Sequence, residues 1–332
     1  MRAILCRQHG GPETLALADL PDPEPGAGEV LVRVRAAGVN FADGLMVRGQ
    51  YQERPPLPFT PGLEVAGEVE AVGPGVTGLE PGRRVLALVD RGGFAERVVA
   101  RAGDVVPLPT GGGGGEGGDG GMNAVTAAGF AIAYGTAHGA LRWRADLVAG
   151  ETLLVHGATS GIGVTAIGMA KAYGCRVIAT ARGAEKAATA RELGADLAID
   201  ASAGDFGPLV AEAGGADVIL DMVGGDYVQR NLDCLNMEGR LVQIAFQAGA
   251  TVEVNLIKLM LKRLTLTGST LRARPPDEKA RLAAAVEATV WPWLTAGQAV
   301  PSVDRTFPLA EAGAAHAWLE GGAHVGKVVL VA

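Results

Sequence analysis

The feature that most constrains the fold is an apolar run that passes directly into a glycine-rich turn and then into a helical pattern. It reads Leu153-Leu-Val-His-Gly157-Ala-Thr-Ser160-Gly161-Ile-Gly163. Glycines in such a turn let the backbone approach a pyrophosphate, whose charge then faces the free N–H groups at the helix N-terminus. The spacing departs from strict G-x-G-x-x-G, so the turn alone also fits an ordinary strand-to-helix connection.

The surrounding pattern favours the nucleotide interpretation. Strands and helices alternate after residue 151, with strands expected over 153–156, 176–181, 197–200, 218–221 and 240–245 and helices over 161–173 and 185–193. Repeated βα units with almost wholly apolar strands predict a parallel sheet covered on both faces. We therefore expect an α/β fold with a Rossmann-type doubly wound sheet and a dinucleotide site at the turn.

The first hundred residues have a different pattern. Val30, Val32 and Val34 alternate with their neighbours, and further strands are expected over 65–72 and 84–89, separated by Pro/Gly turns. Short strands at this spacing indicate a barrel or sandwich. Nine glycines among the eleven residues 111–121 predict a flexible loop, which a small-residue helix pattern follows over 126–141. The C-terminal part returns to β structure, with a helix expected over 310–319 and a final strand over 327–331.

Composition excludes several classes of function. The net charge of −7 lacks the basic footprint of a nucleic-acid-binding protein and would not attract the chain to an anionic membrane. Three distant cysteines (Cys6, Cys175 and Cys234) form no disulfide framework or zinc ribbon and suit a reducing cytosol. The uncharged stretches 120–141 and 152–170 are broken by Gly, Thr and His, so neither predicts a membrane span. We expect a cytoplasmic protein with no signal peptide.

The end of the second predicted strand bears on cofactor choice. An NAD site usually has an acid there to accept a hydrogen bond from the ribose 2′-hydroxyl. Here the sequence reads Ile178-Ala-Thr-Ala-Arg182, with no acid before Glu185. Arg182 and Lys186 could bind a 2′-phosphate, although such a pair is often only a solvated surface feature. The missing acid favours NADPH.

The turn is also similar to that of short-chain dehydrogenases, which need a Tyr with a Lys four residues later. The residues four places after the tyrosines are Pro55, His138, Val177 and Asn231. The Tyr–Lys pair is absent, and the turn lies in mid-chain rather than at the N-terminus. The short-chain interpretation is therefore rejected.

A series of motifs in order along nearly the whole chain points to another family. They are Ala37-Gly-Val-Asn40-Phe-Ala-Asp43, Arg48-Gly-Gln-Tyr51, Pro61-Gly-Leu-Glu-Val-Ala-Gly67, Gly92-Gly-Phe-Ala-Glu96, the segment from Gly150 to Ala158, Gly239-Arg-Leu-Val-Gln-Ile244 and His324-Val-Gly-Lys-Val-Val-Leu330. In these the chain resembles the zinc-free quinone oxidoreductase (zeta-crystallin-like) branch of the medium-chain dehydrogenase/reductase superfamily. The resemblance implies a GroES-like β-barrel catalytic domain of residues 1–123 with 271–332, and a Rossmann dinucleotide-binding domain of residues 124–270.

The resemblance also implies a metal-free site. Zinc-dependent relatives have a Cys where this chain has Asn40 and a His where it has Leu63. Three scattered cysteines cannot form a four-Cys structural zinc lobe. Without a Lewis acid the acceptor must itself be electrophilic. We expect hydride transfer from NADPH to a quinone, with reduction of an enone or alkenal double bond as the alternative and a structural or RNA-binding role as an alternative of another class.

Site residues follow from the same resemblance. Asn40, Tyr51 and Thr136 would line the catalytic pocket, and Asn40 and Tyr51 could donate hydrogen bonds to charge growing on the acceptor oxygen. The structural alternatives are a turn residue for Asn40 and a packing residue for Tyr51, and Asp43 is interpreted as a loop carboxylate. Some relatives have a second Tyr where this chain has Leu45, which makes the acceptor end more apolar. The expected cofactor contacts are Ala158, Ser160, Gly161, Ile162, Gly163, Arg182, Lys186, Val223, Ile244, Phe246 and Lys327.

The segment Leu264-Thr-Leu-Thr-Gly-Ser-Thr270 is expected to form a strand at the end of the sheet. An exposed sheet edge invites pairing with another chain. Because members of the branch pair such edges across a two-fold axis, the resemblance implies a homodimer. The alternative is an edge covered by the loop over 272–276.

Overall fold

The computed structural model describes residues 1–109, 122–298 and 301–332. The chain divides into two compact units, and the predicted glycine-rich loop over 111–121 lies outside the described residues. Of the described residues, unit 1 comprises 1–109, 122–132, 274–297 and 301–332, and unit 2 comprises 133–273 and 298. The first change of unit lies between residues 132 and 133, later in the chain than the expected boundary at 123/124. Helix α2 (Ala124–Ala128) packs on strands of unit 1, which accounts for the later position.

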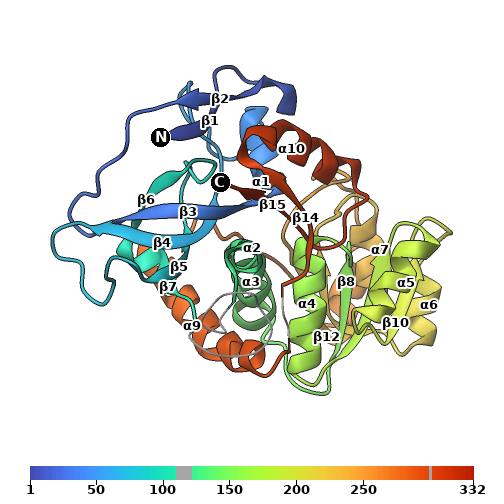
Figure 1. Ribbon diagram of the computed structural model, residues 1–332. Helices are drawn as coiled ribbons and strands as arrows, with labels where there is room; N and C mark the ends of the chain where they lie inside the picture. Colours follow the sequence, from blue (N-terminus) through green and yellow to red (C-terminus); the bar gives the residue numbers. More distant parts are fainter. Residues whose placement is uncertain (110–121, 299–300) are drawn as a thin grey trace. The chain divides into compact units, whose positions relative to one another are not determined.

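Unit 2 contains a parallel sheet with the strand order β10-β9-β8-β11-β12-β13. This is the doubly wound order, which reverses between β8 and β11. Figure 1 labels β8, β10 and β12 of this sheet. The strands are β8 (Thr152–His156), β9 (Arg176–Ala181), β10 (Leu197–Asp200), β11 (Ala216–Asp221), β12 (Leu235–Gln243) and β13 (Thr265–Gly268). The predicted Rossmann-type sheet is confirmed.

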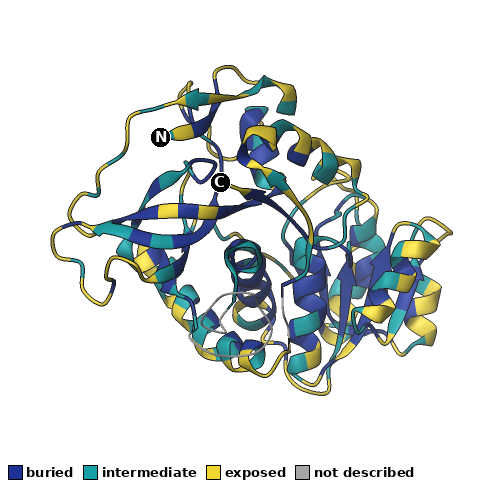
Figure 2. Ribbon diagram, viewed as in Figure 1, coloured by how far each residue is buried: buried dark blue, intermediate teal, exposed yellow. Residues whose placement is uncertain are grey.

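Helices cover both faces of this sheet. Helices α4 and α5 pack on β8, β9 and β10, whereas α6 and α7 close the opposite face over an apolar cluster that includes Leu154, Ile178 and Ile219. Figure 2 shows these strands as mostly buried. The helices of unit 2 are α3 (Ala131–His138), which begins in unit 1 and continues as a π-helical turn (Gly139–Arg144), α4 (Gly161–Ala172), α5 (Ala184–Glu192), α6 (Gly207–Glu212), α7 (Tyr227–Cys234) and α8 (Ile257–Leu261).

The helix expected over 126–141 is wrong as a single element. Helix α2 ends at Ala128 and α3 begins at Ala131, with Gly129 between them. A side chain at Gly129 would lie 3.1 Å from Cγ of Lys327. Glycine therefore permits a close approach at the point where the helix breaks.

Unit 1 is built around β3 (Glu29–Val39), which pairs with β4, β6 and β15. The C-terminal strand β15 runs antiparallel to β3, so the end of the chain returns to the N-terminal sheet. This agrees with the expected barrel-like domain. The remaining strands are β1 (Arg2–Cys6), β2 (Leu15–Asp19), β4 (Glu64–Val72), β5 (Arg84–Leu88), β6 (Arg97–Arg101), β7 (Val105–Pro107), β14 (Val303–Pro308) and β15 (Lys327–Val331).

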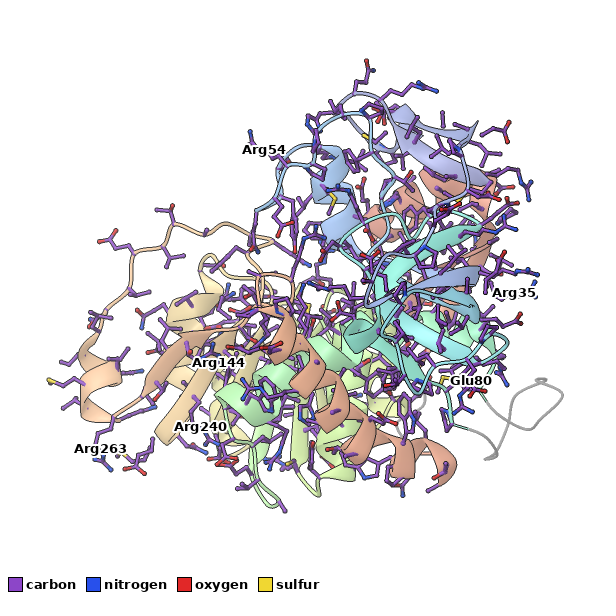
Figure 3. All side chains as sticks on the ribbon, turned by 90° about the vertical axis from the view of Figure 1, so that its left-hand side faces the viewer. Arg35, Arg54, Glu80, Arg144, Arg240 and Arg263 are labelled. Atoms are coloured by element: carbon purple, nitrogen blue, oxygen red, sulfur yellow. The ribbon has the colours of Figure 1, made fainter. Side chains whose placement is uncertain are left out.

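Unit 1 also contains helices. They are α1 (Phe41–Val47), α2, α9 (Pro276–Thr295) and α10 (Ala312–Gly321), with 3-10 turns over Pro12–Thr14, Ala102–Asp104 and Leu309–Glu311. The charged side chains on the sheet pair across strands, as Arg35 (labelled in Figure 3) does with Glu68 at 3.1 Å. Within the part of the chain that the structure describes, no helix is both long and apolar enough to cross a bilayer.

Asp43 is not the loop carboxylate that we expected. It lies in the first turn of α1 and is fully buried, where one oxygen accepts the Asn40 N–H at 2.8 Å and the other the Gly62 N–H at 3.2 Å. Burial raises the pKa of the Asp43 carboxyl to about 7, because desolvation outweighs these two hydrogen bonds and the nearby charge of Lys327. The carboxyl joins the start of α1 to the segment before β4.

We predict that Asp43 makes the protein less stable as the pH rises from about 4 to about 7. In that window the folded carboxyl keeps its proton while the unfolded one has lost it, so the folded state binds more protons and the free energy of unfolding falls with pH. The slope from one such group is at most about 1.4 kcal/mol per pH unit. Urea unfolding at several pH values, compared between the wild type and Asp43→Asn, measures it.

The variant should lose this slope whatever its absolute stability. His316 is a built-in contrast in the same unit, because burial lowers its pKa to about 4 and its contribution has the opposite sign. An unchanged slope in Asp43→Asn would contradict the assignment.

Candidate active site

The predicted phosphate turn lies at the carboxyl end of β8. Gly157 has φ +65°, and a side chain at Gly163 would lie 2.2 Å from the Gly157 carbonyl oxygen, so both positions need glycine. Ser160 caps α4 by accepting the Gly163 N–H at 3.0 Å. The amides of Gly161 and Ile162 have no acceptor among the described residues. Two unpaired N–H groups at a helix N-terminus fit an anion.

The two predicted cations follow the end of β9. Arg182 follows the strand and is exposed, and Lys186 lies in the first turns of α5. An acid that sequence reasoning missed lies beside them: Asp200, at the end of β10, accepts the Gly183 N–H at 2.8 Å and the Ser202 hydroxyl at 2.6 Å. Hydrogen bonds from Ser202 and Gly183 lower the Asp200 pKa. Asp200 was missed because it belongs to the next strand of the chain.

The structure brings the other predicted cofactor contacts of unit 2 to the same edge of the sheet. Val223 follows β11, and its carbonyl accepts the Ala248 N–H at 2.7 Å, beyond β12. The Ile244 N–H donates to the Asp221 carbonyl at 2.8 Å, and the Ser160 hydroxyl lies 3.4 Å from Sδ of Met222. Phe246 is 51% exposed here. The carboxyl ends of β8, β11 and β12 therefore gather Ala158, Ser160, Gly161, Ile162, Gly163, Val223, Ile244 and Phe246.

The remaining predicted residues are divided between the two units. Thr136 lies half-buried on α3 in unit 2, whereas Asn40, Tyr51 and Lys327 belong to unit 1. Each group is therefore described within its own unit.

Within unit 1, Asn40 and Lys327 form a buried polar cluster with Glu64, a residue that we did not predict. The Lys327 ammonium donates to Asn40 Oδ1 and to Glu64 Oε1, both at 2.6 Å. Glu64 Oε2 accepts the Ile132 N–H at 2.7 Å. Glu64 is fully buried and Lys327 is 6% exposed. Glu64 could have been identified from its place in the Pro61–Gly67 motif, next to Leu63 at the zinc-ligand position of the metal-dependent relatives.

Asn40 is committed to this cluster on both sides of its amide. Its Nδ2 donates to Glu64 Oε1 at 3.0 Å and to the Gly38 carbonyl at 3.3 Å, while its Oδ1 accepts from Lys327. The expected donation by Asn40 to an acceptor oxygen would have to replace one of these bonds. The ring of Tyr51 packs against an apolar cluster of Cys6, Met46, Val47, Phe59 and Leu63.

The two positions that carry zinc ligands in the metal-dependent relatives have a different chemistry here. Leu63 is 5% exposed within the apolar cluster, and Asn40 lies beside an ammonium group. A neighbouring cation opposes the binding of a second one. Across residues 1–109, 122–298 and 301–332, no group of three His, Cys, Asp or Glu side chains is arranged to hold a metal ion.

Comparisons with known proteins identify the family of the chain. A family model described as alcohol dehydrogenase GroES-like domain matches residues 26–110, and one described as zinc-binding dehydrogenase matches residues 161–288. Human quinone oxidoreductase is 31% identical over 100% of this chain and 98% of its own. A quinone oxidoreductase-like protein 2 homolog from Nematostella vectensis is 32% identical over 99% of this chain and 88% of its own.

Comparison with solved structures supports the same family. The quinone oxidoreductase of Thermus thermophilus, determined alone and with NADPH, is 37% identical with a TM-score of 0.85, and both chains are covered completely. The Escherichia coli quinone oxidoreductase complexed with NADPH is 29% identical with a TM-score of 0.87 over both whole chains. The paired GroES-like and Rossmann-type architecture is thus confirmed, and the chain belongs to the quinone oxidoreductase branch of the medium-chain dehydrogenase/reductase superfamily.

Proposed function

We propose that the protein is an NADPH-dependent, zinc-free reductase of quinones. The observation that carries this proposal is the phosphate turn together with an end of β9 that presents Arg182 and no acid of its own. The similar Thermus thermophilus and Escherichia coli enzymes were both solved with NADPH, which supports the choice of cofactor. When bound, NADPH supplies a hydride at its nicotinamide ring.

The residues of unit 2 hold and orient this cofactor. The Gly161 and Ile162 amides bind the pyrophosphate, and Arg182 and Lys186 bind the 2′-phosphate. Val223, Ile244 and Phe246 follow β11 and β12, on the other side of the strand-order reversal from the phosphate turn, where the second half of a dinucleotide is expected. The chain thereby aligns the bound cofactor and excludes water. None of its polar side chains has to take part in the transfer of the hydride.

The buried cluster in unit 1 favours a quinone as the acceptor. Asn40 is already hydrogen-bonded through both ends of its amide, so it gives little further help to a developing oxyanion. A quinone is electrophilic enough to accept hydride with less stabilisation at its oxygen than an enone needs. Reduction of an enone or alkenal remains the alternative, and it requires a hydrogen-bond donor to the acceptor oxygen, for which Tyr51 is the candidate.

The first prediction of the proposed function concerns the 2′-phosphate. Replacing both Arg182 and Lys186 with Ala should weaken NADPH binding by about 1–3 kcal/mol and leave NADH binding almost unchanged, because only NADPH has the extra phosphate. Titration calorimetry with both cofactors measures the difference. Arg176→Ala is a matched control, since it removes a cation from the opposite end of β9. Equal losses for NADPH and NADH would contradict the assignment.

The second prediction concerns the acceptor. The wild type should oxidise NADPH faster with a quinone panel than with an enone panel, and Tyr51→Phe should lower enone turnover about 10- to 100-fold with a smaller effect on quinones. The NADPH affinity should not change. Stopped-flow rates on both panels test this. Dialysis against a chelator should leave these rates unchanged, because the proposed reaction needs no zinc. Faster enone reduction by the wild type, or stoichiometric zinc in the active protein, would contradict the proposal.

A homodimer is also proposed. Strand β13 is an edge of the described sheet and displays Leu266, 45% exposed. Helix α8 before it exposes Ile257, Met260 and Leu261 at 55–66%, and Arg263, labelled in Figure 3, follows this helix. An exposed apolar patch beside an unpaired sheet edge is typical of a chain-pairing surface.

We predict that Leu261→Lys combined with Leu266→Lys gives a monomer, whereas the wild type has the mass of a dimer at micromolar concentration. The two lysines would bury like charges across a two-fold axis. Light scattering measures the mass. Leu209→Lys is the control, because Leu209 on α6 is 47% exposed in the same unit but away from β13. A monomeric wild type would defeat the proposal.

The cysteines fit the cytoplasmic location that we propose. Cys6, Cys175 and Cys234 are all free and buried. Burial raises the pKa of each of the three thiols, which keeps them protonated and unreactive. Free thiols of this kind are usual in a reducing compartment.

A further inference from the structure

A second buried polar network lies beneath the cofactor edge of unit 2 and has no role in the function proposed above. It contains His156, Thr180, Asp221 and Asn231, of which Thr180 is 2% exposed and the others fully buried. These residues come from β8, β9, β11 and α7. Buried polar groups are costly unless every partner is satisfied, so a complete network of this kind specifies one arrangement of the elements that it joins.

The donor and the acceptor of each hydrogen bond in the network can be assigned by starting from Asp221. The Asp221 carboxylate can only accept, and its Oδ2 accepts a hydrogen bond from Nδ2 of Asn231 at 3.0 Å. The Asn231 amide oxygen must then accept, which places the imidazole proton on Nε2 of His156, 2.7 Å away. Nδ1 of His156 is left to accept from the Thr180 hydroxyl at 2.8 Å.

The surroundings keep the imidazole neutral and in place. Its ring lies 4.9 Å from both the Phe206 and Tyr227 rings, and Arg230 stacks on Tyr227 at 4.5 Å. Desolvation in this apolar setting lowers the pKa of His156, with the Arg230 charge acting in the same direction and Asp221 and Asn231 opposing it. A neutral imidazole can be a donor at one nitrogen and an acceptor at the other, as the network requires.

Both ends of the network reach predicted cofactor contacts. Asp221 Oδ1 accepts the N–H groups of Val223 at 2.6 Å and Gly224 at 3.1 Å, which fixes the loop after β11. At the other end, the Thr180 carbonyl accepts the Ala158 N–H at 3.0 Å, within the phosphate turn. Strands β9 and β11 lie on either side of β8, so the network crosses the point where the strand order reverses.

We propose that His156 and Asn231 are positioning residues for NADPH, which hold the phosphate turn and the Val223–Gly224 loop at the spacing that one dinucleotide needs. The inference rests on the proposed placement of the cofactor along this edge. It predicts that replacing either side chain lowers the affinity only for a ligand that spans both loops. A ligand that occupies only the adenosine end does not depend on that spacing.

The test compares NADPH with 2′,5′-ADP by titration calorimetry. His156→Leu and Asn231→Leu should each raise the Kd for NADPH about tenfold or more, with a change in the Kd for 2′,5′-ADP below about threefold. His156→Gln, which can donate to Asn231 and accept from Thr180, should restore the NADPH Kd to within about threefold of the wild type. Thr180→Val, a milder change that removes only the hydroxyl, should raise it about two- to fivefold.

Val210→Ala is the control for a loss of stability alone. Val210 is fully buried in the same unit but takes no part in the network, so its variant should lower the melting temperature with no change in either Kd. The proposal is overturned if His156→Leu leaves the NADPH Kd unchanged, if both ligands weaken equally, or if Val210→Ala reproduces the loss. Failure to reduce quinones would not affect these binding measurements, so the two proposals can fail separately.

Discussion

The buried ion pair between Lys327 and Glu64 is the interaction on which the architecture of unit 1 depends. Its members are 263 residues apart in the chain and join β15 to β4. Asn40, directly after β3, is bound to both, and Glu64 also accepts the N–H of Ile132, with which the N-terminal part of unit 1 ends. Removing one partner from such a pair typically costs about 3–5 kcal/mol, because the other charge is left buried and unpaired.

This ion pair also explains why small residues surround it. A side chain at Gly38 would lie 2.3 Å from Glu64 Oε1 and 2.4 Å from the Ala128 carbonyl. Gly129 leaves room for the Lys327 side chain in the same way. The glycine that interrupts the expected helix over 126–141 thus makes space for the charge that neutralises Glu64. The break between α2 and α3 is therefore explained by a contact with Lys327, a residue distant in the sequence.

Sequence reasoning predicted the geometry of a turn built from neighbouring residues and missed a cluster built from distant ones. The phosphate turn from Gly157 to Gly163 was predictable because its glycines, its N-cap serine and the flanking strand are contiguous. The cluster of Asn40 with Lys327 was not, since no local pattern indicates a contact across 287 residues. Helix α9 could have been predicted, because its buried residues Leu282, Val286, Val290 and Leu294 recur every four positions.

Each unit contains a buried polar cluster, and the two clusters satisfy their polar groups with different chemistry. In unit 1 a lysine and a glutamate form a buried ion pair, and the Asn40 amide bound to both lies at a position where the metal-dependent relatives place a thiolate ligand. In unit 2 the network from Thr180 to Asp221 ends on backbone N–H groups and contains a single carboxylate. In both clusters the oxygens of the carboxylate, Glu64 or Asp221, accept hydrogen bonds from the fold itself. Under the proposed function the protein therefore contributes mainly position, and the rate should follow the electron affinity of the acceptor more closely than its hydrogen-bonding capacity.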